Sequence, residues 1–111
     1  MEKKGPQHRR GRRRLRIIKA LVSARQYQYS AKVHRLIEEG DLDLEDMERC
    51  ILSASDIEKV EPDELGTAVD GCKYTILGLD TNGLSFYTCG KIIRNDEDRQ
   101  LYFFITAHEQ D

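Results

Sequence analysis

The sequence predicts an α+β domain in which three N-terminal helices precede an antiparallel sheet of about four strands. Apolar residues recur at helical spacing as far as about Ser53, and short runs rich in β-branched and aromatic residues, bounded by turn residues, follow it. The chain has 111 residues, 39% hydrophobic and 34% charged, so it has room for one domain with a modest core. We expect residues 12–111 to form that domain. Residues 1–11 lack hydrophobic periodicity and are predicted to be a disordered basic tail.

The helical half is predicted from apolar spacing and from capping residues. Residues 12–26 place apolar side chains on one face and basic side chains on another, which is typical of a basic amphipathic helix. After a short extended break at residues 27–29, Ser30 can cap a second helix that stops at Gly40. Asp43 can cap the third helix.

The second half is predicted to contain a β-hairpin and two further strands. Residues 73–81 and 84–93 flank the dipeptide Asn82-Gly83, which is typical of a two-residue type I′ turn. The remaining strands are expected at residues 56–61 and 99–108.

A two-residue turn places Thr81 opposite Leu84 and so fixes which side chains share a face of the sheet. The predicted core face carries Leu77, Leu79, Leu84, Phe86 and Ile92 from the hairpin, and Leu101, Phe103, Ile105 and Ala107 from the last strand. The opposite face gathers Tyr74, Tyr87, Lys91, Tyr102, Phe104, Thr106 and His108. Aromatic rings can stack bases and a lysine can bind phosphate, so this face is a candidate RNA-binding surface. The alternative for each ring is a structural role, because aromatic side chains fit well on a half-buried face of a pleated sheet.

The formal net charge of -2 hides a division along the chain. Residues 1–32 hold eleven Lys or Arg and one Glu, while the remainder holds seven basic and nineteen acidic residues. A basic segment on an acidic body indicates polyanion binding, with Arg12, Arg13, Arg16 and Lys19 as the candidate contacts. The alternative is that the segment folds back on the acidic body or only promotes solubility.

Composition disfavours other classes of protein. No apolar run approaches the roughly 20 residues of a membrane span, and no secretory signal is present, so we expect a cytoplasmic protein with no membrane partner. Cys50, Cys72 and Cys89 lack the paired short spacing of zinc sites. We expect packed free thiols, with a Cys72–Cys89 disulfide as the alternative, and neither a metal nor another cofactor.

Three stretches of the sequence resemble one bacterial family. They read YSAKVHRLIEEGDLDLEDMERCIL at residues 29–52, GCKYTILGLDTNGLSFYTCGKII at residues 71–93, and LYFFITAHE at residues 101–109. Over about residues 27–109 the chain resembles the bacterial domain-of-unknown-function family 4258, which is similar to the barnase, EndoU, colicin and RelE toxin superfamily. In that superfamily helices precede a four-stranded antiparallel sheet whose face cuts RNA without a metal.

The resemblance implies a toxin-like, metal-independent endoribonuclease of a bacterial toxin–antitoxin pair. The implied partners are RNA, free or on the ribosome, and a small zinc-finger antitoxin that would cover the site. The reaction would be attack of a ribose 2′-hydroxyl on the adjacent phosphate.

The resemblance also suggests residues for that reaction. Arg35 takes the position of the family's arginine, whereas Ala31 and Glu39 stand where the family has a histidine and a basic residue. His34 lies one turn beyond Ala31, and His108 replaces a tyrosine of the family's C-terminal pattern. The candidate catalytic residues are His108, Lys91, Arg35, His34 and Tyr87, and the candidate substrate contacts on the sheet are Tyr74, Tyr102 and Thr106. We expect His108→Ala and Lys91→Ala to abolish cleavage and to leave the fold intact.

Two other functions fit the same residues. A non-catalytic nucleic-acid-binding module would use the basic segment for affinity and the sheet only to stack bases. A protein-interaction domain would pair the basic segment with the acidic body, within one chain or between chains. On residues alone, His34 fits an ordinary surface histidine.

Overall fold

The computed structural model describes the backbone of residues 5–109 and the side chains of residues 11–108. Within this range the chain forms three helices and five strands, which confirms the predicted α+β class. In chain order they are α1 (Gly5–Ser23), β1 (Tyr27–Tyr29), α2 (Ala31–Glu38), α3 (Leu44–Ser53), β2 (Lys59–Pro62), β3 (Cys72–Leu79), β4 (Ser85–Arg94) and β5 (Gln100–Glu109). No helix in this range is long and apolar enough to cross a membrane.

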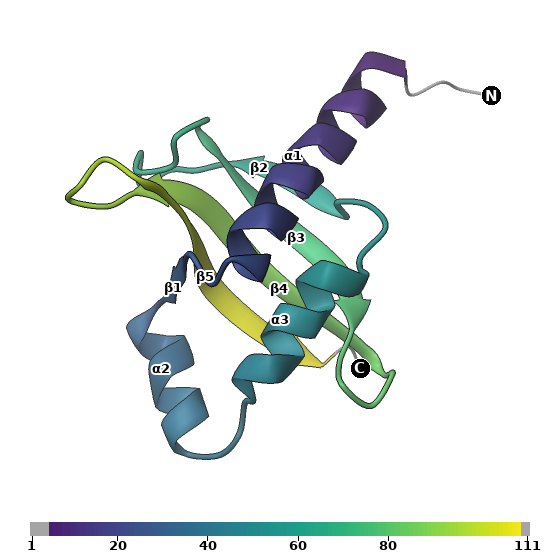
Figure 1. The fold of residues 1–111 in the computed structure, drawn as a ribbon, viewed down its shortest axis with the longest axis vertical. Helices are drawn as coiled ribbons and strands as arrows, with labels where there is room; N and C mark the ends of the chain where they lie inside the picture. The colour runs from purple at the N-terminus through teal and green to yellow at the C-terminus, as the bar shows by residue number, and fades with distance from the viewer. Residues whose placement is uncertain (1–4, 110–111) are drawn as a thin grey trace.

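All five strands belong to one sheet, in the order β1-β5-β4-β3-β2. The first strand runs parallel to β5, and every other pair of neighbours is antiparallel. Figure 1 shows α1 and α3 lying across one face of this sheet, with α2 beside β1. The other face carries no helix in the described chain, and we call it the open face.

The predicted helix caps are confirmed. The Ser30 hydroxyl accepts a hydrogen bond from the Val33 N–H at 3.1 Å, and the Asp43 carboxylate accepts one from the Glu45 N–H at 3.0 Å. Each cap satisfies an N–H that the first helical turn leaves without a partner inside the helix. The bounds of α1 differ from the prediction: it begins at Gly5 within the predicted tail, and it ends at Ser23, close before Arg25, which has a φ of 60°. The expectation for residues 1–4 lies outside the described part of the chain.

The core lies between the helices and the sheet. Its helical side consists of Leu15, Ile18 and Val22 from α1, Val33 from α2, and Met47, Cys50 and Ile51 from α3. Its sheet side consists of Tyr74 and Ile76 from β3, Phe86 and Ile92 from β4, and Tyr102, Phe104 and Ala107 from β5. The buried residues of α1 recur at the three- to four-residue spacing of one helical face, so burial of this face holds α1 on the sheet.

The hairpin between β3 and β4 has a different turn from the predicted one. The Asp80 N–H donates to the Leu84 carbonyl at 2.8 Å, the Gly83 N–H donates to the Asp80 carbonyl at 3.0 Å, and Gly83 has a φ of 81°. This geometry is a three-residue loop with a glycine bulge, not a two-residue type I′ turn. Leu79 therefore pairs with Ser85 instead of with Phe86.

This shift of one residue reverses the predicted faces of β3. Successive strand residues point to opposite faces, so a one-residue change of register exchanges the two sets of side chains. Tyr74 and Ile76 lie in the core, whereas Leu77 and Leu79 lie on the open face. The predicted faces of β3 were therefore wrong, while Phe86 and Ile92 of β4 are in the core as predicted.

A bulge in β5 explains a second error. The pairing with β4 skips a residue between Thr106 and Phe104, so Ile105 has no partner in the ladder. On the N-terminal side of the bulge, Tyr102 and Phe104 are buried in the core, the reverse of the prediction. On its C-terminal side, Ala107 is in the core and His108 is on the open face, as predicted.

Candidate functional site

The open face carries polar and aromatic side chains from β2, β3, β4 and β5. The cross-strand pairs that place them there are Lys59 with Thr75, Leu77 with Tyr87, Thr75 with Cys89, Cys89 with Thr106, Lys91 with Phe103, and Tyr87 with His108. Paired residues in an antiparallel sheet point to the same face, so these side chains form one surface.

Tyr87 and His108 form the closest aromatic contact of this surface. They lie directly opposite each other on β4 and β5, with ring centroids 4.2 Å apart and ring planes at 64°. Beside Tyr87 is a cavity of about 350 Å³, lined by Glu58, Lys59, Thr75, Leu77 and Tyr87, which we call the open-face cavity. The lining therefore offers a ring, an ammonium group, a hydroxyl and a carboxylate, and the ring contacts the His108 imidazole.

His108 itself lines a different cavity, of about 530 Å³, between the turn from α2 to α3 and the ends of β4 and β5. Three carboxylates line it, from Asp41, Asp43 and Asp46. A cavity with this charge repels a phosphodiester. For an anionic ligand, the side of His108 that contacts Tyr87 is therefore the more favourable approach.

Lys91 lies on the open face as predicted but is covered by the loop of residues 63–71. Its ammonium nitrogen lies 3.1 Å from an Asp63 carboxylate oxygen, and the two side chains are only 5% and 3% exposed. The Asp63 carboxylate also accepts hydrogen bonds from the N–H groups of Thr67 and Ala68. Burial raises the pKa of Asp63, but the hydrogen bonds from Ala68 and Lys91 outweigh it and hold the pKa below its ordinary value. Lys91 thus neutralises an internal carboxylate and is not in position to bind a phosphate.

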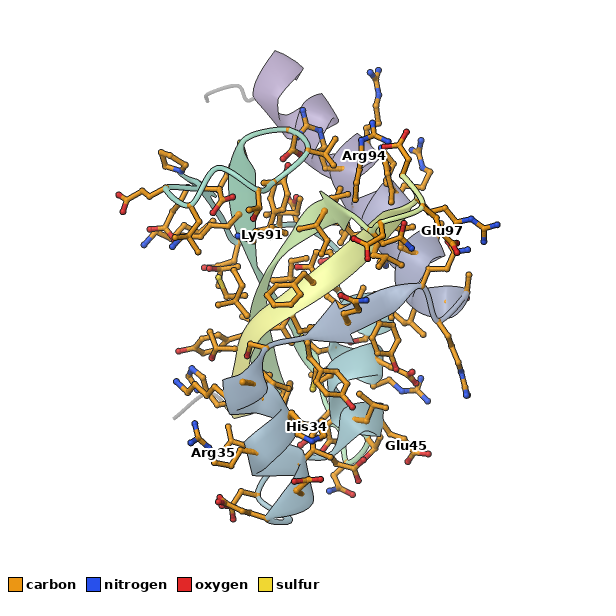
Figure 2. All side chains as sticks on the ribbon, turned by 90° about the vertical axis from the view of Figure 1, so that its left-hand side faces the viewer. His34, Arg35, Glu45, Lys91, Arg94 and Glu97 are labelled. Carbon is orange, nitrogen blue, oxygen red and sulfur yellow. The ribbon has the colours of Figure 1, made fainter. Side chains whose placement is uncertain are left out.

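The candidates on α2 do not join the open-face group. The His34 imidazole lies 3.2 Å from a Glu38 carboxylate oxygen and stacks on Tyr29, with centroids 6.0 Å apart. Figure 2 shows His34 and Arg35 leaving α2 in different directions, with Lys91 toward the other end of the molecule. The structure therefore does not bring these three predicted residues together.

Tyr74 and Tyr102 were predicted to contact substrate, but they are core residues. Their exposed fractions are 1% and 0%, because both point to the helix-covered face. The Tyr74 hydroxyl donates to Asp70 and accepts from Arg14, and burial together with the bond to Asp70 raises its pKa. Burial raises the pKa of Tyr102 far above its ordinary value. Neither ring can stack a base without opening the core.

The predicted basic contacts lie on the other side of the molecule from Tyr87 and His108. Arg12, Arg13 and Arg16 are exposed on α1, and Lys19 is half-buried. The Lys19 ammonium donates to the Leu52 carbonyl at 3.2 Å, in the helical layer. The sheet separates these cations from the open-face cavity.

Of the residues that line the open-face cavity, only Tyr87 was a candidate from the sequence. Lys59, Thr75 and Leu77 were not candidates, because the predicted register turned Leu77 toward the core and placed Thr75 outside the site. The signal that would have found them is the turn: an Asp at position 80 can accept hydrogen bonds from the N–H groups of Asn82 and Leu84, as it does here.

The cysteines add no cross-link to this surface. All three thiols are free, and Cys89 opposes Thr75 instead of Cys72. Burial raises the pKa of the Cys50 thiol to about 11, and this thiol contacts the carbonyls of Ile76 and Phe86 in the core. The Cys50 thiol is therefore a packing group, as predicted, whereas Cys72 and Cys89 are half-buried.

No family model, curated protein or solved structure matches the chain. The fold defines it as an α+β domain with one sheet face covered by helices and one open face. The resemblance described for residues 27–109 stays a prediction.

Proposed function

We propose that the protein is a toxin-like endoribonuclease that binds RNA on the open face and cleaves it by attack of a 2′-hydroxyl on the adjacent phosphate. The observation that carries this proposal is the contact of Tyr87 with His108 beside the open-face cavity. This arrangement supplies an imidazole for acid–base chemistry, a ring for stacking and a nearby cation.

The proposed roles follow from this geometry. The His108 imidazole takes the proton of the 2′-hydroxyl, whose oxygen forms the new bond to phosphorus. The bond from phosphorus to the 5′-oxygen breaks, and His108 returns the proton to that leaving oxygen. The products are a 2′,3′-cyclic phosphate and a free 5′-hydroxyl. Tyr87 stacks a base, and the exposed Lys59 ammonium group, which pairs with Glu61 at 3.4 Å, offsets charge on the phosphate.

A protein partner fits the same face. Leu79 is 45% exposed and Phe103 is half-buried, so the open face leaves apolar surface outside the core. A small antitoxin seated on this face would bury these side chains and block Tyr87 and His108 at once. We include such a partner in the proposal.

A second candidate function is RNA binding without cleavage. The observation that favours it is the exposure of Arg12, Arg13 and Arg16 on α1, away from any acid–base group of the open face. This function predicts binding that weakens as salt rises, with no change in RNA length.

The test compares His108→Ala with His34→Ala on a long RNA in excess EDTA, with detection of 2′,3′-cyclic phosphate ends. We expect the wild type and His34→Ala to cleave, and His108→Ala to be slower by about 100-fold or more. Equal cleavage by His108→Ala would remove the proposed site. Binding by all three proteins, with no cleavage on free RNA or on ribosomes, would establish the second function instead.

A further inference from the structure

The exposed side of α1 carries a continuous row of cations. At about 100° per residue, Arg12, Arg13, Arg16 and Lys19 fall within an arc of roughly 120°, away from the buried residues Leu15, Ile18 and Val22. We call these four residues the basic ridge. Its side chains flank a shallow depression of about 210 Å³ lined by Arg12, Leu15, Arg16, Lys19 and Ser55.

The guanidinium groups of the ridge are not used by the fold. Among the described residues, Arg12, Arg13 and Arg16 form no ion pair or hydrogen bond through their side chains. Arg14, which points from another side of the helix, bonds to Asp70 and to the Tyr74 hydroxyl instead. The chain thus pairs the arginine that faces the sheet and leaves those of the ridge available to a ligand.

The ridge is rigid and accessible. Arg12, Arg13 and Arg16 are exposed, and Figure 1 shows that the N-terminal half of α1, which carries Arg12 and Arg13, extends past the sheet. Packing of Leu15, Ile18 and Val22 fixes the helix beneath the ridge. The bond from Lys19 to the Leu52 carbonyl fixes one end of the ridge on α3.

The chemistry of the ridge favours a phosphate backbone. The planar fork of arginine matches phosphate oxygens in two-point contacts, and three of the four cations are arginines. Proteins that bind single strands add aromatic rings that stack bases, and α1 contains no Tyr, Phe or Trp. A row of cations without stacking groups fits the regular phosphates of a double helix.

We propose that the basic ridge binds the backbone of double-helical RNA, at a site separated by the sheet from Tyr87 and His108. The choice of RNA over DNA rests on the proposed function, whereas backbone binding by the ridge does not. A folded RNA would then be held by a helical segment on α1.

The test measures binding of a labelled RNA duplex of about 20 base pairs by fluorescence anisotropy, from about 50 to 200 mM salt. The variant is Arg12→Gln/Arg13→Gln/Arg16→Gln, and glutamine preserves helix propensity. The matched control, Lys32→Gln/Arg49→Gln/Arg99→Gln, removes the same charge from exposed residues elsewhere. Circular dichroism establishes that both variants are folded.

We expect the ridge variant to raise Kd about tenfold or more at about 100 mM salt and to reduce the salt slope by about 2 to 3. The control variant should change Kd by less than about threefold. Equal weakening by both variants, or none by the ridge variant, would overturn the ridge as a site.

The remaining outcomes test the identity of the ligand. Three results would overturn double-helical RNA as the ligand of the ridge. They are tighter binding of single-stranded RNA, equal binding of a DNA duplex, and displacement by polyglutamate of equal charge. His108→Ala should bind the duplex as the wild type does. This variant separates the two proposals. Loss of cleavage with duplex binding intact supports both of them, whereas cleavage by His108→Ala at the wild-type rate contradicts only the proposed function.

Discussion

Two fully buried tyrosines differ in what their hydroxyl groups contact. The Tyr74 hydroxyl bonds to Asp70 and Arg14, whereas the Tyr102 hydroxyl has no hydrogen-bond partner among the described residues. An unpaired buried hydroxyl costs free energy, so Tyr102→Phe should leave the free energy of unfolding unchanged or raise it by about 1 kcal/mol. Tyr74→Phe should lower it by about 1 to 2 kcal/mol, since it breaks bonds to charged groups. Urea unfolding measures both, and an equal loss in both variants would contradict the difference in pairing.

Residue-scale features were predictable where their cause is local. Ser30 and Asp43 cap helices through bonds to N–H groups two or three residues away, so a short window of sequence contains the whole interaction. The role of Tyr74 was not predictable in this way, because its partner Arg14 lies far away in the sequence on α1, and Asp70 lies in the loop before β3. His108 was placed on the correct face because it follows the bulge of β5.

The register of β3 and β4 is set by the turn that joins them. Asn82-Gly83 is compatible with both a two-residue and a three-residue loop, and the Asp80 carboxylate selects the longer one by accepting two N–H bonds. The turn from β4 to β5 repeats this geometry: Asn95 accepts from two N–H groups and Asp98 has a φ of 66°. The strands were therefore predictable from composition, whereas the open-face cavity depends on a register that composition does not determine.

Packing of α3 on β3 requires glycine at position 78. A Cβ there would lie 2.0 Å from the Cys50 carbonyl oxygen, which is backbone and cannot move aside. Gly78→Ala should lower the free energy of unfolding by about 3 kcal/mol or prevent folding. Gly11→Ala is the matched control: its Cβ would meet an Asp56 oxygen at an ordinary 3.7 Å, and alanine should stabilise α1 by up to about 1 kcal/mol. Urea unfolding of both variants checks this, and a mild effect of Gly78→Ala would mean that α3 can move away from β3.

At the scale of the whole molecule, the loop of residues 63–71 links the two faces of the sheet. Asp63, at its start, bonds to Lys91 on the open face, and Asp70, near its end, bonds to Arg14 of α1. The Val69 N–H donates to the Ile92 carbonyl at 2.8 Å, so the loop also bonds to β4 just before β3 begins. One segment therefore couples the helix that carries the basic ridge to the strand that carries Tyr87.

This coupling predicts that the fold is sensitive to acid. It also predicts that Lys91→Ala destabilises the fold, whereas the sequence analysis expected this variant to leave the fold intact. Because the folded pKa of Asp63 is lowered, its contribution to stability is present above the ordinary carboxyl pKa and is lost as pH falls through the folded value. Lys91→Ala leaves the Asp63 carboxylate buried and unpaired, so Tm should fall by on the order of 5–10 °C at neutral pH. The deficit should shrink in acid, where Asp63 is protonated.

Asp63→Asn/Lys91→Met removes both charges and should melt near the wild type at neutral pH, with a smaller loss in acid. Thermal melts across pH test this, and a Lys91→Ala deficit that stays constant in acid would exclude the ion pair as its cause.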